Sequence, residues 1–252
     1  MNPLQRALIS KTGYEYGFEN VVAESHSGLS LASAQHRATI EVTMDGRAYV
    51  ARLLRPGTLM LAELSRHFSS QQGSFYCDSI DQLARLLRRT SELAHSLPNQ
   101  AKQAFDASLA NELAKLPTVI KGTEVERMVR QRIGQQAFRS AMLEYWGGAC
   151  AVTGITISEV LRASHAKPWA DCVSDNERLD VFNGFLLSAN LDALFDRFLI
   201  SFSAAGDLLV APRILEAERE HLGLNQALRL RWLAPDHEPY LHYHRQRFEA
   251  NL

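Results

Sequence analysis

The first part of the chain carries short runs of β-prone residues. Two such runs within residues 38–54 flank Asp45-Gly46, and Asp-Gly favours the positive φ angles of a tight hairpin turn. Residues 14–18, Tyr-Glu-Tyr-Gly-Phe, are predicted to form a further strand. We therefore expect the N-terminal region, up to about residue 75, to be rich in strands.

From residue 78 the apolar residues fall at helical spacing. Residues 79–97 predict one helix, which Pro98 ends because proline cannot continue a helix. A second helix is predicted over residues 99–116, ended by Pro117. The polar segment 98–118 is bounded by prolines, so we predict the domain boundary within it.

A third helix is predicted from near Thr123. Thr123 and Glu126 fit a capping box, in which each side chain bonds the backbone of the other. Gly147-Gly148 marks the end of this helix, because glycine readily adopts the left-handed conformation that closes helices.

The next segment predicts a strand, a loop, a second strand and a helix, followed by a hairpin. The first strand ends at Ser164-His165, and Pro168 breaks it. The second strand covers residues 183–187, the helix covers 190–198, and residues 199–210 form the hairpin.

Composition and charge restrict the class of protein. The chain has 252 residues, of which 46% are apolar and 22% charged, as in ordinary globular proteins. The net charge is -1, whereas proteins that grip nucleic acid mainly by electrostatics are usually basic. A local basic patch can suffice, so the charge lowers the expectation of tight non-specific binding without excluding DNA.

Cysteines and apolar runs exclude other classes. The three cysteines stand far apart with no CxxC pair, which argues against a disulfide framework and excludes a four-cysteine zinc site. No basic start with an apolar run marks a signal peptide, and no run reaches the roughly 18 apolar residues of a membrane span. We predict a cytoplasmic protein without a membrane partner.

Several segments together resemble the HNH endonuclease family. They are Ile133–Arg139, Cys150–Gly154, Ala163–Trp169 and Asn183–Asp196. The resemblance covers roughly residues 123–215. It implies an α+β protein in which a C-terminal ββα-metal nuclease domain, residues 118–252, follows a mixed strand and helix domain, residues 1–117.

The resemblance also implies roles for the motif residues. His165 matches the general base, Asn183 matches the residue that holds the loop in place, and Asp192 matches a metal ligand. A carboxylate ligand favours Mg²⁺ or Mn²⁺ over softer ions. The sequence departs from the family at Ser164, where many members carry a second ligand, Asp or His. Asp196 lies four residues beyond Asp192 and is a candidate second carboxylate, with an outward cap or ion pair as the alternative.

Basic residues near the motif are candidates for DNA contact. Lys167, Arg162 and Arg197 are predicted to meet phosphates. Arginines also crowd the preceding helix, where either a solvated face or DNA contact would explain them. They are Arg127, Arg130, Arg132 and Arg139. Trp169 is interpreted as a core or lid residue rather than a platform for stacking bases.

The leading hypothesis is a metal-dependent endonuclease that hydrolyses double-stranded DNA in restriction or anti-phage defence. By architecture alone, residues 1–117 would sense the target. One alternative is a DNA-binding or regulatory module that kept the fold but lost efficient catalysis, and another is a toxin-like nuclease. A homodimer is left open, because one site cuts one strand at a time.

Overall fold

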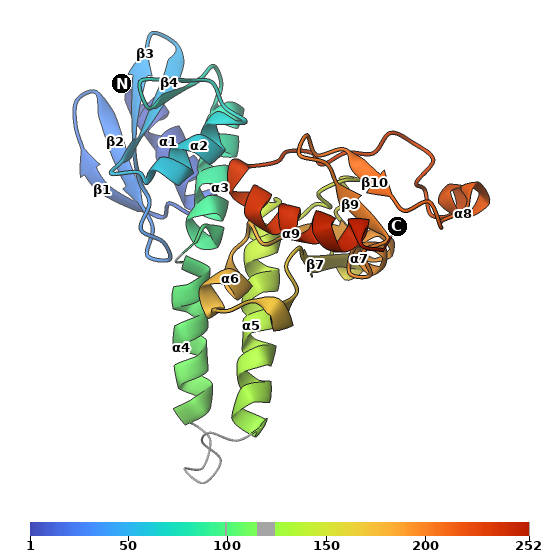
Figure 1. The fold of residues 1–252 in the computed structure, drawn as a ribbon. Coiled ribbons are helices and arrows are strands. Elements are labelled where there is room, and N and C mark those ends of the chain that lie inside the picture. The colour runs from blue at the N-terminus through green and yellow to red at the C-terminus, as the bar shows by residue number, and fades with distance from the viewer. Residues whose placement is uncertain (99, 115–123, 252) are drawn as a thin grey trace. The chain divides into compact units, whose positions relative to one another are not determined.

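The computed structural model describes residues 1–98, 100–114 and 124–251 and divides the chain into two compact units, Met1–Leu97 and Pro98–Leu252 (Figure 1). Each unit is described by itself. The division falls at the start of the predicted boundary segment 98–118. The predicted domain limit at 117/118, the helix stop at Pro117 and the cap at Thr123 lie outside the described residues.

The first unit contains a six-stranded antiparallel sheet with the strand order β1-β2-β3-β4-β6-β5. Its strands are β1 (Asn20–Glu24), β2 (Gly28–Ala32), β3 (Thr39–Asp45), β4 (Ala48–Leu54), β5 (Ser70–Gln71) and β6 (Ser74–Cys77). Asp45 pairs with Ala48 and Gly46 has a φ of 59°, so the predicted Asp-Gly hairpin is confirmed.

One face of this sheet forms the core of the first unit. Leu31, Ile40 and Leu53 are paired across three strands and are buried. Alternate residues along each strand point to opposite faces, so the intervening positions are more exposed. Helix α1 (Pro3–Glu15) contacts β2, and α3 (Ile80–Ser96) contacts β4 and β6. The short helix α2 (Thr58–Ser65) packs against α3.

The predicted strand at residues 14–18 is wrong, because α1 continues to Glu15. Asn2 and Gln5 form a capping box that starts this helix, and Gly17 then turns the chain with a φ of 88°. The predicted helix over 79–97 is confirmed as α3. Ser79 accepts a hydrogen bond from the Gln82 backbone, which satisfies one of the free N–H groups at its start.

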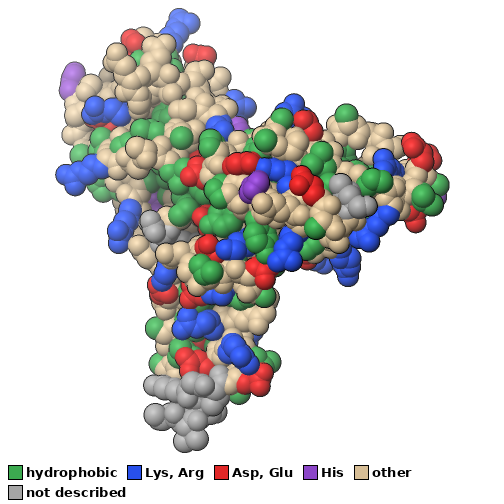
Figure 2. Space-filling model, viewed as in Figure 1, with side chains coloured by type: hydrophobic (Ala, Val, Ile, Leu, Met, Phe, Trp, Pro, Cys, Tyr) green, Lys and Arg blue, Asp and Glu red, His purple; other side chains and the backbone are tan. Residues whose placement is uncertain are grey.

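The second unit begins with two long helices that pack together, α4 (Gln100–Ala114) and α5 (Glu124–Tyr145). Figure 2 shows acidic and basic side chains intermingled along them, and ion pairs such as Arg132 with Glu112 link the two helices. The end of α5 at Gly147-Gly148 is confirmed, because both glycines have positive φ angles of 61° and 66°.

After α5 the predicted order of elements is confirmed. Strands β7 (Leu161–His165) and β8 (Gly184–Ser188) pair antiparallel, and α7 (Ala189–Phe195) follows. The hairpin of β9 (Ile200–Phe202) and β10 (Leu208–Val210) comes next. The unit also contains α6 (Asp175–Leu179), α8 (Glu216–His221) and α9 (Glu238–Glu249). The fold class is therefore α+β, as predicted.

Aromatic side chains fill the core of the second unit. Trp146 stacks on Trp232 with ring centroids 4.3 Å apart, and Phe185 contacts Phe195 and Phe202. All three cysteines are buried and free, in agreement with the absence of a disulfide framework. Among the described residues, no helix is both long and apolar enough to cross a membrane.

Candidate functional site

The two short strands and the helix after them bring the motif residues together. His165 ends β7 and pairs with Gly184, the first residue of β8. A Cβ atom at Gly184 would lie 2.0 Å from the Ser164 carbonyl oxygen, so only glycine allows this close approach. Asn183 stands directly before the strand, and α7 begins where β8 ends and carries Asp192.

A pocket of about 530 Å³ opens where these elements meet α5 and α9. His165, Asp192 and Asp196 line it together with Arg139 and Arg162. A base, two carboxylates and two guanidinium groups therefore share one solvent-filled space. Two of the three predicted metal-ligand candidates and one of the three predicted phosphate contacts, Arg162, are among these residues.

His165 is held as a neutral imidazole with one free nitrogen. Its Nε2 lies 2.9 Å from the backbone oxygen of Arg178. A carbonyl oxygen only accepts, so Nε2 carries the proton and Nδ1 has the lone pair. The ring stacks on Phe138 with centroids 3.8 Å apart. Burial lowers the pKa of His165 to about 4, against a smaller rise from the Arg178 carbonyl.

Two carboxylates lie near each other in the pocket. Burial and the neighbouring Asp192 carboxylate raise the pKa of Asp196 to about 6, with Arg197 acting in the opposite direction. The Ser164 hydroxyl donates a hydrogen bond to Asp192 Oδ1 at 2.5 Å. Ser164 is itself buried and does not line the pocket. It is therefore placed to orient Asp192, and its expected role as a metal ligand stays a prediction.

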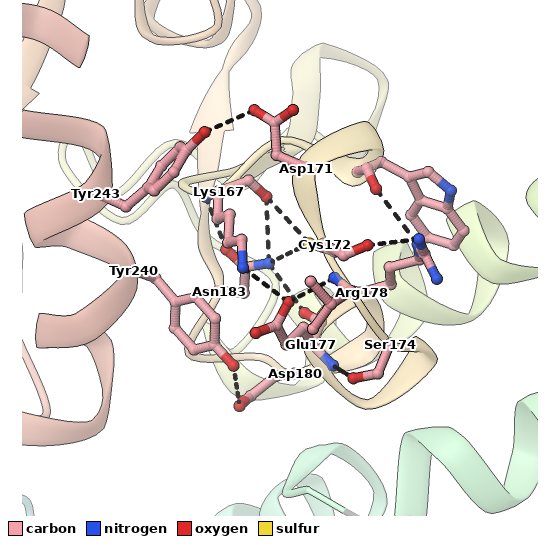
Figure 3. Close-up of polar contacts among 12 residues, drawn as sticks. Lys167, Asp171, Cys172, Ser174, Glu177, Arg178, Asp180, Asn183, Tyr240 and Tyr243 are labelled. Atoms are coloured by element: carbon pink, nitrogen blue, oxygen red, sulfur yellow. Dashed lines mark hydrogen bonds and ion pairs between the residues drawn. The ribbon is translucent and has the colours of Figure 1, made fainter. Parts of the chain in front are cut away.

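Asn183 binds backbone rather than facing the pocket. It is fully buried, its Oδ1 accepts from the Lys167 backbone N–H at 2.8 Å, and its Nδ2 contacts the carbonyl oxygens of Lys167 and Glu177 (Figure 3). Nδ2 also lies 3.3 Å from Cys172 Sγ. These contacts link Asn183 at the end of the loop between β7 and β8 to Lys167 near its start and to Glu177 within it.

An ion pair also links two residues of the same loop, Lys167 and Glu177. Lys167 Nζ lies 2.9 Å from a Glu177 carboxylate oxygen and does not line the pocket. The expected contact of Lys167 with a phosphate stays a prediction, and in the structure its ammonium group pairs with Glu177. Arg197 is exposed, donates to the Ala193 carbonyl and also lies outside the pocket lining.

Helix α9 supports the loop and α7 from the other side. Tyr240 and Tyr243 donate hydrogen bonds to Asp180 and Asp171 on the loop, as Figure 3 shows. His244 lies on α9, is buried and lines the pocket. The His244 ring stacks on Phe195 of α7 with centroids 3.7 Å apart.

The described residues contain no group of three or more His, Cys, Asp or Glu side chains that could hold a metal ion. The pair Asp192 and Asp196 nevertheless suits one type of ion. Mg²⁺ and Mn²⁺ prefer oxygen ligands, and Mg²⁺ is commonly held by one or two carboxylates with water and substrate phosphates. The donor set therefore fits a hard divalent ion that shares its ligands with a nucleic-acid phosphate.

Sequence reasoning missed two residues that shape the site. Arg178 acts on His165 through its backbone carbonyl, which no side-chain motif reveals. Its guanidinium also binds the Trp169 and Cys172 carbonyls within the loop. Phe138 lies in the segment Ile133–Arg139 that carried part of the resemblance, so a signal for it was present.

The stability of this unit is expected to fall in mild acid because of His244. Its Nε2 donates to the Phe195 carbonyl and its Nδ1 accepts from Ser201, so the neutral ring is satisfied. Burial lowers the pKa of His244 to about 4 from 6.5. The unfolded chain therefore takes up a proton first, and the stabilisation, fully present above pH 6.5, is lost as the pH falls towards 4. The expected loss at pH 5 is about 2 kcal/mol.

Urea unfolding at pH 7.5 and pH 5 measures this loss. His244→Gln keeps a donor for the Phe195 carbonyl but cannot titrate. The difference in unfolding free energy between pH 7.5 and pH 5 should therefore be about 2 kcal/mol smaller in this variant than in the wild type. His242→Gln is the control, because His242 is exposed on the same helix. An unchanged pH dependence in His244→Gln would refute the assignment.

Comparison with known proteins agrees with this geometry. Residues 150–203 match the protein-family model described as HNH endonuclease. The matched segment includes β7, the loop, β8, α7 and β9. Residues 204–252 follow it, so the predicted position of the nuclease domain at the C-terminus is only partly correct. A search of the curated proteins found no match.

Proposed function

We propose, from the match of residues 150–203 to the HNH endonuclease family model, that the protein is a metal-dependent endonuclease that hydrolyses phosphodiester bonds in double-stranded DNA. One observation carries the proposal. A neutral histidine with a free nitrogen, His165, shares a pocket with the adjacent carboxylates Asp192 and Asp196. This is the combination of base and oxygen ligands that metal-assisted hydrolysis requires.

His165 is proposed to act as the general base. Its Nδ1 would accept a proton from the water that attacks the phosphorus atom. The Arg178 carbonyl would favour the imidazolium that forms, because it already accepts a hydrogen bond from Nε2–H. The Phe138 ring and the fixed loop keep the imidazole from rotating away.

Asp192 and Asp196 are proposed to hold the Mg²⁺ or Mn²⁺ ion. When bound, the ion would neutralise the phosphate and the leaving 3′ oxygen. Ser164 would keep the Asp192 carboxylate in the orientation that binding needs, through its hydrogen bond to Oδ1. Burial and, second to it, the neighbouring Asp192 carboxylate raise the pKa of Asp196, and a bound cation would offset both effects.

The biological setting follows from architecture alone. We place the activity in restriction or anti-phage defence, with the first unit, Met1–Leu97, sensing the target. A break in both strands would require two copies of the chain or two sequential nicks. The alternative is a catalytically weakened DNA-binding or regulatory module, which Ser164 at a ligand position and the net charge of -1 favour.

A plasmid cleavage assay tests the proposed function. Wild-type protein is incubated with unmodified and phage-derived modified DNA in Mg²⁺, in Mn²⁺ and in EDTA. Cutting that requires the metal supports the endonuclease. Binding of DNA without cutting of any substrate supports the binding module instead.

Asp192→Asn is expected to lower the cleavage rate about a hundredfold and to weaken Mn²⁺ binding. The amide oxygen can still accept from Ser164, so the substitution removes charge while preserving shape. Isothermal titration with Mn²⁺ and the plasmid assay measure the two effects. Asp207→Asn is the matched control, since Asp207 lies in the β9–β10 hairpin and outside the pocket lining. Unchanged Mn²⁺ binding and cleavage in Asp192→Asn would remove Asp192 as a ligand.

A further inference from the structure

Two guanidinium groups converge on one backbone carbonyl at the edge of the pocket. Arg139 Nη1 and Arg162 Nη1 lie 2.7 Å and 2.9 Å from the Leu161 oxygen. Arg139 Nη2 also donates to the Ser158 carbonyl, and Arg162 Nη1 donates to the Glu159 carbonyl. Arg139 comes from α5 and Arg162 from β7. Neutral carbonyl acceptors therefore hold both guanidinium groups in place.

Their positive charges are not neutralised by the protein. Within the described parts of the chain, neither Arg139 nor Arg162 has a carboxylate within 4.0 Å. The other arginines of α5 differ in this respect. Arg127, Arg130 and Arg132 pair with Glu124, Asp175 and Glu112. Two close cations without a counterion repel each other, and an anion placed between them would relieve that repulsion.

Each guanidinium keeps donors for such an anion. A guanidinium has five N–H groups in a planar fork that matches the oxygens of a phosphate. The carbonyl contacts of Arg139 and of Arg162 each use two of them. Because carbonyl contacts already restrain the side chains, binding would cost less conformational entropy than binding by free arginines.

We propose that Arg139 and Arg162 form a clamp for a backbone phosphate of the DNA strand that enters the pocket. The inference rests on the proposed function, since it takes DNA as the substrate. Both residues line the pocket that contains His165 and Asp192, so a phosphate held by the clamp would fix the register of the strand relative to the base and the metal ligands. Of the four arginines on α5 for which DNA contact was one of two interpretations, we assign that contact to Arg139.

Salt dependence of DNA binding tests the clamp. Binding of a fluorescein-labelled DNA duplex is measured by anisotropy in EDTA, which prevents cutting, over a range of KCl concentrations. Each lost phosphate contact should reduce the slope of log Kd against log[KCl] by about 0.9. The double variant loses the one clamped phosphate, so its slope should fall by about 0.9, and Arg139→Gln and Arg162→Gln should each show part of this reduction. Arg139→Lys keeps the charge and should keep the slope.

Arg219→Gln is the matched control. Arg219 also donates to two backbone carbonyls, those of Ile214 and Ala211, and has no carboxylate within 4.0 Å in the described residues. It lies on α8 and does not line the pocket. Loss of a carbonyl-bound arginine alone should therefore leave the slope unchanged. Arg162 is exposed, so Arg162→Gln serves as the test if Arg139→Gln does not fold.

The outcomes separate the clamp from the nuclease. Reduced slopes in protein that never cuts DNA would support the clamp and refute the proposed hydrolysis. Metal-dependent cutting with unchanged slopes in both glutamine variants would overturn the clamp and leave the proposed function intact. Wild-type protein that neither binds nor cuts DNA would overturn both.

Discussion

His165→Ala is expected to lower the rate of DNA cleavage about a thousandfold, because it removes the imidazole nitrogen that we propose accepts a proton from water. DNA affinity in EDTA should stay close to wild type, since the charged groups of the pocket remain. Single-turnover plasmid cleavage in Mn²⁺ measures the rate, and anisotropy measures the affinity.

The control for His165→Ala is His242→Ala, which removes an exposed histidine from α9. Thermal unfolding followed by circular dichroism verifies that the variant is folded, because the lost ring stacks on Phe138. Added imidazole should restore part of the activity, since it can enter the space that the side chain leaves. Full activity of His165→Ala without imidazole would remove the general base from the proposal.

Asn183→Ala is expected to lower the free energy of unfolding by about 3 kcal/mol and to abolish most cleavage. The side chain bonds the Lys167 backbone N–H and two backbone carbonyls while fully buried. Alanine leaves these groups without their partner, and buried polar groups without partners are costly. The loop that orients His165 through Arg178 would loosen as well. Urea unfolding and plasmid cleavage measure the two effects.

Asn183→Asp removes the Nδ2 donor while keeping nearly the same side-chain shape, so it distinguishes the two contributions to stability. It keeps an acceptor for the Lys167 N–H but turns a charged oxygen towards the carbonyls of Lys167 and Glu177. Its destabilisation should therefore equal or exceed that of alanine. Asn190→Ala is the control, because Asn190 is exposed at the start of α7. Wild-type stability of Asn183→Ala would show that the loop is held by other contacts.

Local signals in the sequence were sufficient for most elements near the site. The Asp45-Gly46 turn, the serine cap at Ser79 and the paired glycines after α5 each act within a few residues, so they can be read without knowledge of the fold. The motif residues His165 and Asp192 were instead identified from the resemblance to the HNH endonuclease family. The structure places both at one pocket, as the order of strand, loop, strand and helix predicted.

The sequence did not reveal structure that depends on residues distant in the chain. Tyr14 and Phe18 suggested a strand by residue type, yet the Asn2 capping box starts a helix that runs through the first of them. Nothing in the sequence indicated the ion pair between Lys167 and Glu177, ten residues later. The hydrogen bond from Ser164 to Asp192 was equally without a sign in the sequence. Residue identity does not specify such pairings.

The pocket is assembled from more of the chain than the family match includes. β7 and β8 form a ribbon of only two strands, which is marginal by itself in water. Phe138 and His244, which pack on the two sides of the site, come from α5 and α9 outside residues 150–203. Transfer of residues 150–203 alone would move His165 and Asp192 without the residues of α5 and α9 that pack around the pocket. The shortest segment that carries the pocket together with its packing partners therefore extends from α5 through α9.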